Sequence, residues 1–155
     1  MSATHSTVES PRAAGLSIRS AARSWAGVAP PRKRVLVVDD DPVMRELIAR
    51  VVLRVGDTPV HARSATEALA LMAGEPVDLI LTDLNMNGLG GLDLLAQLST
   101  RPNSPPTLVI TASDDPGELR AARLLGARRV IQKPISLAEL RGAIGAALDD
   151  LLAAA

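Results

Sequence analysis

The sequence predicts an α/β domain in which a parallel β-sheet carries helices on both of its faces. Short continuous apolar runs alternate with stretches of helical periodicity, five times over, from about residue 34 to the C-terminus. The runs contain too few polar residues for one side of each strand to face water, so the strands are expected to be buried on both faces. With 155 residues, the chain has room for one such domain and a tail.

The predicted strands are short, and a helix with its own start signal follows each one. The strands are Val35–Val38, Thr58–Ala62, Asp78–Thr82, Thr107–Thr111 and Arg129–Gln132. The helices are expected over residues 42–55, 65–72, 92–98 and 116–125, and from residue 137 onward. In the first helix Asp41 is the N-cap, Pro42 is the first helical residue and Gly56 is the stop.

The other helices begin with a recurring signal, except the one after the third strand. The pairs with the spacing of a capping box are Ser64 with Glu67, Asp115 with Glu118, and Ser136 with Glu139. Residues 83–91, after the third strand, form a loop rich in Gly and Asn. The strict alternation of strand and helix, more than any single element, supports a parallel sheet.

Polar residues stand where the predicted strands end. They are Asp39 and Asp40 after the first strand, Asp83 after the third, Thr111 at the end of the fourth and Lys133 after the fifth. Because the carboxyl ends of parallel strands meet at one edge of the sheet, we expect these groups to converge there. Lys133 is one of only two lysines beside 15 arginines, which favours a phosphate contact over a solvated surface position.

This set of groups suits phosphoryl chemistry. Clustered carboxylates repel one another unless something neutralises them, and Asp oxygens are ligands that Mg²⁺ accepts. One carboxylate can also attack phosphorus and give an aspartyl phosphate, whose charge a lysine and a hydroxyl can offset. Taken alone, Asp83 has an alternative interpretation as a turn residue before the Gly-rich loop. The chain has no cysteine, so thiolate metal sites and a cysteine nucleophile are excluded.

Charge and composition divide the chain near its start. Residues 1–32 are predicted to be a disordered, basic leader rich in Ser, Ala, Arg and Pro, and residues 33–155 an acidic folded domain. No apolar segment is long enough for a signal peptide or a membrane span, so a cytoplasmic location is expected. An acidic domain without aromatic residues is not expected to bind duplex DNA or to stack on single-stranded bases, since the one aromatic residue of the chain, Trp25, lies in the leader.

Four sequence strings together resemble one known family. They are Val-Leu-Val-Val-Asp-Asp-Asp-Pro at 35–42, Asp-Leu-Ile-Leu-Thr-Asp-Leu-Asn-Met-Asn-Gly at 78–88, Val-Ile-Thr-Ala at 109–112 and Gly-Ala-Arg-Arg-Val-Ile-Gln-Lys-Pro at 126–134. In this order, and each at a strand end, they are similar to the receiver domain of bacterial two-component response regulators over about residues 33–152. The resemblance implies a doubly wound, flavodoxin-like sheet of strand order 2-1-3-4-5 with five helices.

The resemblance also implies a role for each residue at the strand ends. Asp83 would accept a phosphoryl group, and Lys133, in a cis peptide bond with Pro134, would pair with a phosphate oxygen. Asp39 and Asp40 would hold Mg²⁺, with Asp40 as the direct ligand, and Asn85 would add its backbone carbonyl. Thr111 would hydrogen-bond the phosphate and report its presence.

Two departures from the family pattern concern the loop and the signal. Asn87 stands before the loop glycine where relatives usually carry proline, so we expect a more flexible loop. Val130 takes the place of the aromatic residue that usually moves together with the Thr111 hydroxyl. We therefore expect the signal to pass through the loop between the fourth strand and its helix, with small changes over residues 129–132.

The function predicted from these observations is a phosphoacceptor response regulator rather than an enzyme. A histidine kinase or phosphotransfer protein would donate the phosphoryl group, and an unknown protein target would read the signal, because the chain leaves no room for a DNA-binding domain. One alternative is an interaction module that binds a cyclic dinucleotide through a basic face of Arg120, Arg123, Arg128 and Arg129. The same face is otherwise expected to be solvated and partly paired with Asp114, Asp115 and Glu118. A phosphohydrolase of the haloacid dehalogenase type is a third alternative, which the short chain disfavours.

Overall fold

The computed structural model describes residues 29–154, and the part from Arg32 onward forms one compact unit. The predicted basic leader, residues 1–32, lies outside the described residues except for its last four positions. Within residues 29–154, no helix combines the length and the apolar character needed to cross a membrane.

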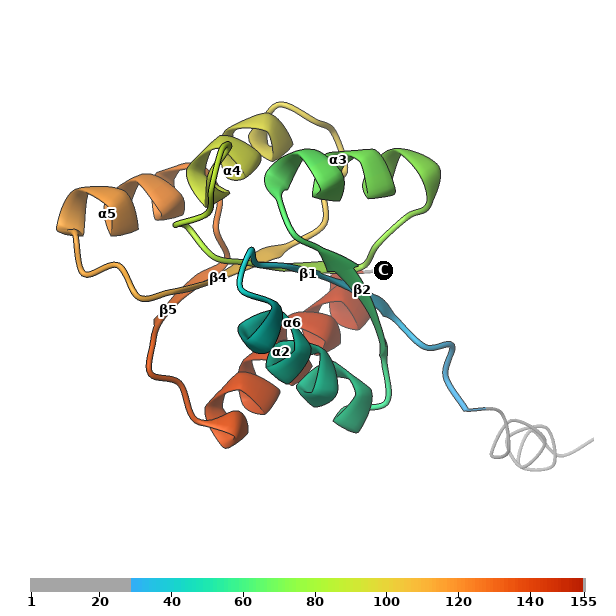
Figure 1. Cartoon of the computed structure of the whole chain (residues 1–155). Coiled ribbons are helices and arrows are strands. Elements are labelled where there is room, and N and C mark those ends of the chain that lie inside the picture. The colour runs from blue at the N-terminus through green and yellow to red at the C-terminus, as the bar shows by residue number, and fades with distance from the viewer. Residues whose placement is uncertain (1–28, 155) are drawn as a thin grey trace, which may run out of the picture. The chain divides into compact units, whose positions relative to one another are not determined.

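The centre of the fold is a parallel sheet of five strands (Figure 1). The strands are β1 (Arg34–Val38), β2 (Thr58–Ala62), β3 (Leu79–Thr82), β4 (Thr107–Thr111) and β5 (Arg129–Gln132). Their order is β2-β1-β3-β4-β5, which confirms the predicted topology. The chain reverses its winding direction between β1 and β3, and in sheets of this kind functional groups lie beyond the carboxyl ends of the strands at that point.

Five helices cover the sheet in two layers. The helices are α2 (Pro42–Arg54), α3 (Ala65–Gly74), α4 (Gly91–Ser99), α5 (Pro116–Leu124) and α6 (Leu137–Ala154). Helices α2 and α6 lie on one face of the sheet, and α3, α4 and α5 lie on the other (Figure 1). The predicted fold class, a sheet with helices on both faces, is therefore confirmed.

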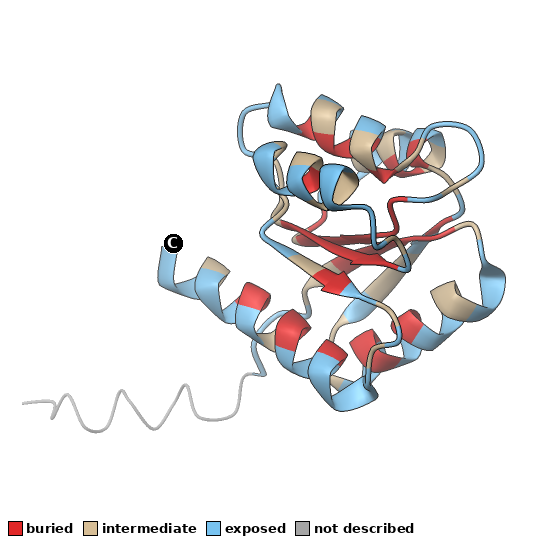
Figure 2. Ribbon diagram, turned by 90° about the vertical axis from the view of Figure 1, so that its left-hand side faces the viewer, coloured by how far each residue is buried: buried red, intermediate tan, exposed pale blue. Residues whose placement is uncertain are grey.

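The core is aliphatic, as expected of a chain without Phe or Tyr. Every residue of β3 and β4 is buried, whereas the edge strands β2 and β5 each keep exposed positions. The buried residues line the sheet and the inner sides of the helices, and the outer sides face solvent (Figure 2). Val and Ile along the central strands fit a sheet that is covered on both faces.

The predicted cap residues begin their helices, but none of the three predicted glutamates closes a capping box on the N–H of its cap. Asp41 accepts from the backbone N–H groups of Val43 and Met44, and Ser64 Oγ accepts from the N–H of Glu67. At the start of α5, Asp115 accepts from two backbone N–H groups. Glu118 does not complete a capping box there, because its carboxylate instead accepts a hydrogen bond from a side chain of the preceding loop.

Candidate functional site

The carboxyl ends of three strands bring an acid pair and a lysine together. Lys133, which follows β5, places its Nζ 2.7 Å from Asp83 Oδ2 and 3.5 Å from Asp39 Oδ2. Asp39 and Asp83, which follow β1 and β3, are 2% and 8% exposed. Two buried carboxylates thus share one ammonium group.

The N–H and both carboxylate oxygens of Asp39 form hydrogen bonds. Its N–H donates to the Ala62 carbonyl at 3.1 Å, and its Oδ1 accepts from the Asp41 N–H at 2.9 Å. Burial is the main cause that raises the pKa of Asp39, and the charge of Asp83 adds to it, while the Asp41 N–H and Lys133 oppose the rise. The carboxylate therefore costs free energy in its charged state unless another cation approaches.

Lys133 is fixed by its backbone as well as by its charge. Its N–H donates to the Thr111 carbonyl at 2.8 Å, and its peptide bond to Pro134 is cis, as expected. Burial lowers the pKa of Lys133 most strongly, but the hydrogen bond and charge of Asp83, together with Asp39, outweigh burial and leave the pKa raised. The ammonium group is therefore charged at neutral pH.

Asp83 is presented by a tight connection between β3 and α4. Its Oδ1 accepts from the Asn85 N–H at 3.1 Å, and its own N–H donates to the Val38 carbonyl at 3.2 Å. A Cβ at Gly91 would lie 2.1 Å from the carbonyl oxygen of Asp83, so only glycine allows α4 to start this close to the strand end.

The side chain of Asp40 contacts the loop between β3 and α4 and does not contact Lys133. Its Oδ2 accepts from the Asn87 N–H at 3.0 Å, a contact between residues 47 positions apart in the chain. Asn85 lies on the exposed side of this loop. The structure therefore brings Asp39, Asp83 and Lys133 into direct contact and places Asp40 and Asn85 beside them.

The donor set fits a divalent cation, although no three acidic or histidine side chains of residues 29–154 are close enough together to form a metal cluster. Asp39 and Asp83 outnumber the one cation that contacts them, and burial, with a smaller contribution from the charge of Asp83, raises the pKa of Asp39. Carboxylate oxygens are the ligands that Mg²⁺ uses, commonly with water in the remaining positions. The residues present are therefore compatible with Mg²⁺.

Thr111 ends β4, is fully buried and connects the strand to the next helix. Its Oγ1 accepts from the Ser113 N–H at 3.1 Å, which leaves the hydroxyl hydrogen free to donate. Ser113 Oγ donates to Glu118 of α5 at 2.5 Å, and the Ser113 carbonyl accepts from the Gln132 side chain at 3.1 Å. Sequence reasoning missed this linking role of Ser113, which depends on contacts across three elements.

The four arginines of the predicted basic face lie away from these carboxylates, on α5 and on and just before β5. Among the described residues, only Arg128 of the four has an acidic partner, Asp150 of α6 at 2.5 Å. The expected pairing with Asp114, Asp115 and Glu118 is therefore wrong. Asp115 caps its own helix, and Glu118 accepts from Ser113, so neither carboxylate turns toward an arginine.

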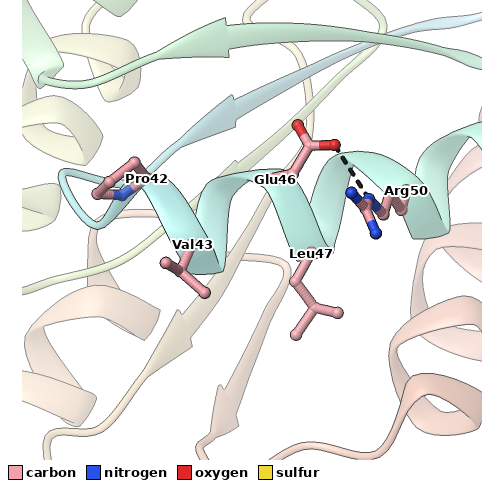
Figure 3. Close-up of a pocket in the computed structure, with 5 residues that line it drawn as sticks. All are labelled: Pro42, Val43, Glu46, Leu47 and Arg50. Atoms are coloured by element: carbon pink, nitrogen blue, oxygen red, sulfur yellow. Dashed lines mark hydrogen bonds and ion pairs between the residues drawn. The ribbon is translucent and has the colours of Figure 1, made fainter.

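An apolar surface on α2 begins directly after the acidic run (Figure 3). Pro42, Val43, Glu46, Leu47 and Arg50 line a cavity of about 390 Å³ there. Val43 is 76% exposed and Leu47 is 41% exposed, whereas Glu46 and Arg50 pair with each other at 3.0 Å. The sequence signal for this surface was two large apolar residues four positions apart, on the side of the helix that faces away from the sheet.

Comparison with known proteins agrees with this geometry. Residues 35–145 match the family described as the response regulator receiver domain. The response regulator protein PilR of Pseudomonas aeruginosa is 36% identical over 117 residues, which make up 76% of this chain and 26% of PilR. The response regulator MprA of Mycobacterium ulcerans is 37% identical over 107 residues, which make up 69% of this chain and 46% of MprA. The chain thus spans less than half of the length of these two curated relatives.

A solved structure resembles the fold. A CheY-like response regulator receiver domain protein from Methanospirillum hungatei superposes with a TM-score of 0.76 at 24% identity. The superposition covers 81% of this chain and 100% of that one. At this identity the likeness concerns the fold alone.

Proposed function

The chain belongs to the response regulator receiver domain family, and from this premise we propose that Asp83 accepts a phosphoryl group in an Mg²⁺-dependent reaction. The family is a signalling module of two-component systems and not an enzyme that turns over a separate substrate. The observation that carries the proposal is the 2.7 Å contact between Lys133 Nζ and Asp83 Oδ2 at the carboxyl edge of the sheet. It puts the one lysine of the site against the carboxylate that would react.

The proposed step is a transfer from a phosphohistidine or an acyl phosphate. An Asp83 carboxylate oxygen forms a bond to phosphorus while the bond from phosphorus to the donor nitrogen or oxygen breaks, and the donor keeps the electron pair. Lys133 and the free hydroxyl hydrogen of Thr111 are suited to bind the phosphoryl oxygens. Mg²⁺, held by Asp39, Asp40, Asp83 and the Asn85 carbonyl, would offset charge on the phosphoryl group.

The family implies a histidine kinase as partner, and we place its docking on α2. The apolar surface of Val43 and Leu47 starts at Pro42, directly after the acidic run, so a helix packed on it brings its histidine toward Asp83. The exposed apolar area would be covered in the complex, which gives the contact its free energy.

The proposed output route runs through Ser113. When Thr111 turns its hydroxyl toward a phosphoryl group, the Ser113 N–H that it binds moves with it, and Glu118 carries the change into α5. Val130 has no side-chain polar group with which to take part. Amide shifts between the resting and phosphoryl-mimic states are therefore expected to be largest over residues 111–118 and small over residues 129–132, and large shifts centred on Val130 would contradict this route.

The direct test is intact mass after incubation with acetyl phosphate and Mg²⁺. We expect a gain of one phosphoryl group, which is lost in Asp83→Asn and in a chelator control and is kept in Asp93→Asn, an acid outside the site. No gain by a folded, Mg²⁺-binding wild-type chain would overturn the proposal.

A second arm tests the docking surface with a phosphorylated histidine kinase as donor. Leu47→Glu is expected to slow transfer from the kinase and to leave transfer from acetyl phosphate unchanged. The control is Leu124→Glu, because Leu124 is 76% exposed on α5, across the sheet from α2. Equal slowing by the two variants would remove α2 as the docking site.

A further inference from the structure

Arg45 stands one turn into α2 and turns its guanidinium back over the connection from β1. Its Nη1 donates to the Asp39 carbonyl oxygen at 2.6 Å, in a partly buried contact. Side chains of a helix lean toward its N-terminus, so a long residue at this position reaches the turn that precedes the helix. The contact therefore ties the second turn of α2 to the acidic end of β1.

A position near the N-terminus of α2 is unfavourable for the positive charge of Arg45 unless its hydrogen bond to the Asp39 carbonyl compensates for it. A positive charge near a helix N-terminus opposes the helix dipole. Arg45 borders a cavity of about 280 Å³ together with His61, Arg63 and Glu67. Within residues 29–154 it nevertheless forms no ion pair with Glu67 or with any other acid. The guanidinium is directed to a neutral carbonyl instead of the nearby carboxylate.

The carbonyl that Arg45 binds belongs to the peptide between Asp39 and Asp40. The N–H and both carboxylate oxygens of Asp39 already have partners in Ala62, Asp41 and Lys133. The contact with Arg45 adds a partner for the carbonyl of Asp39. Because the peptide unit is planar, holding its oxygen also fixes the direction in which the chain carries Asp40.

We propose that Arg45 is a positioning residue that fixes the peptide between Asp39 and Asp40, and with it the two carboxylates that would hold Mg²⁺. This inference rests on the proposed function of the site. Arg45 touches no reacting group, since its contact is with main chain alone.

The test measures Mg²⁺ affinity of the full-length chain from amide shifts, without any phosphoryl donor. Arg45→Met keeps the aliphatic stem and removes both the donors and the charge, and Arg45→Lys keeps a charged N–H donor. Arg50→Met is the matched control, because Arg50 lies on the same helix and pairs with Glu46. We expect Arg45→Met to weaken Mg²⁺ binding by about fivefold or more. Arg45→Lys should restore most of the affinity, and the control should change nothing.

The sign of the effect separates positioning from simple electrostatics. Loss of a positive charge beside carboxylates would, by itself, tighten the binding of a cation. Tighter or unchanged Mg²⁺ binding in Arg45→Met therefore overturns the proposal. Should that variant fail to fold, Arg45→Leu, which also removes the donors and the charge, takes its place in the same comparison.

A second readout does not depend on the metal. In the Mg²⁺-free chain, hydrogen exchange of the Asp41 N–H reports the turn directly, because this group donates to Asp39 Oδ1. We expect faster exchange in Arg45→Met, recovery in Arg45→Lys and unchanged exchange in the core strands. If the wild-type chain binds no Mg²⁺, the proposed function fails while this exchange still decides the role of Arg45. Unchanged exchange at Asp41 overturns the inference.

Discussion

Replacement of Lys133 by methionine tests whether charge balance holds the carboxyl edge of the sheet together. Methionine keeps most of the aliphatic stem and removes the ammonium that contacts Asp83 at 2.7 Å and Asp39 at 3.5 Å. The variant leaves two buried carboxylates with no cation between them. We expect a clear loss of stability even though no packing is removed.

The magnitude follows from the exposure of the three side chains. Removing one partner of a fully buried pair costs about 3–5 kcal/mol, and exposed pairs contribute about 0–1 kcal/mol. The Lys133 side chain is 17% exposed, and those of Asp39 and Asp83 are 3% and 9% exposed. The expected cost is therefore about 2–3 kcal/mol at neutral pH. In urea this lowers the unfolding midpoint by about 1–2 M for a domain of this size.

The stability loss of Lys133→Met is expected to depend on pH in a direction set by the pKa of Asp39. Burial and Asp83 raise the pKa of Asp39, and without Lys133 the pKa of Asp39 rises further. A folded chain that holds a proton more tightly than the unfolded chain becomes more stable as the pH falls. The deficit of Lys133→Met relative to wild type should therefore shrink as the pH is lowered from 7 towards 5.

The control is the only other lysine of the chain. Lys33 lies 4.0 Å from Asp78, with side chains 30% and 38% exposed, so Lys33→Met should cost about 0.5 kcal/mol or less. Equal midpoints for wild type and Lys133→Met, or a deficit that does not vary with pH, would refute the argument from charge.

Three further predictions concern the same edge of the sheet. Asp39→Asn should stabilise the Mg²⁺-free chain at pH 7 in urea unfolding, since burial raises the pKa of Asp39. The gain should fade as the pH drops through that raised pKa towards 3.8. Gly91→Ala should destabilise the folded chain by about 2 kcal/mol or more and lower the yield of phosphorylation, because the added Cβ would lie 2.1 Å from the carbonyl oxygen of Asp83. In the control Gly142→Ala the added Cβ meets nothing within 4 Å, so this variant should be neutral or stabilising. Gln132→Leu removes the hydrogen bond that holds the Ser113 carbonyl at rest, so affinity for a phosphoryl mimic should rise about fivefold; lower affinity in calorimetry would contradict this.

Most of the fold could be predicted because its signals are local. Asp41 and Pro42 start α2 as a cap and a first helical residue, and Ser64 starts α3 by accepting from its own helix. The strand order came instead from the family resemblance, since the apolar runs alone do not say which strands are neighbours. The reversal between β1 and β3 is the result of that order.

Sequence reasoning missed two contacts in which a residue had more than one possible partner. Glu118 has the spacing of a capping residue, yet Ser113 lies in reach and takes its carboxylate. Arg128 was expected to pair with Asp114, Asp115 or Glu118, but it pairs with Asp150 of α6, 22 positions away in the chain. Spacing along the chain predicts caps well, but the choice among several possible partners is made by tertiary packing.

At the carboxyl edge of the sheet, the same excess of negative charge lowers the stability of the folded chain and strengthens the binding of a cation. Asp39 and Asp83 share Lys133, and the excess charge disfavours the folded chain until a cation arrives. A ligand that binds only the folded chain stabilises it, so Mg²⁺ should recover more free energy in variants in which the excess is larger. Lys133→Met should therefore be less stable than wild type and bind Mg²⁺ more tightly, and Asp39→Asn should be more stable and bind it more weakly. Stability and affinity that fall together across this series would show that packing, and not charge, governs the site.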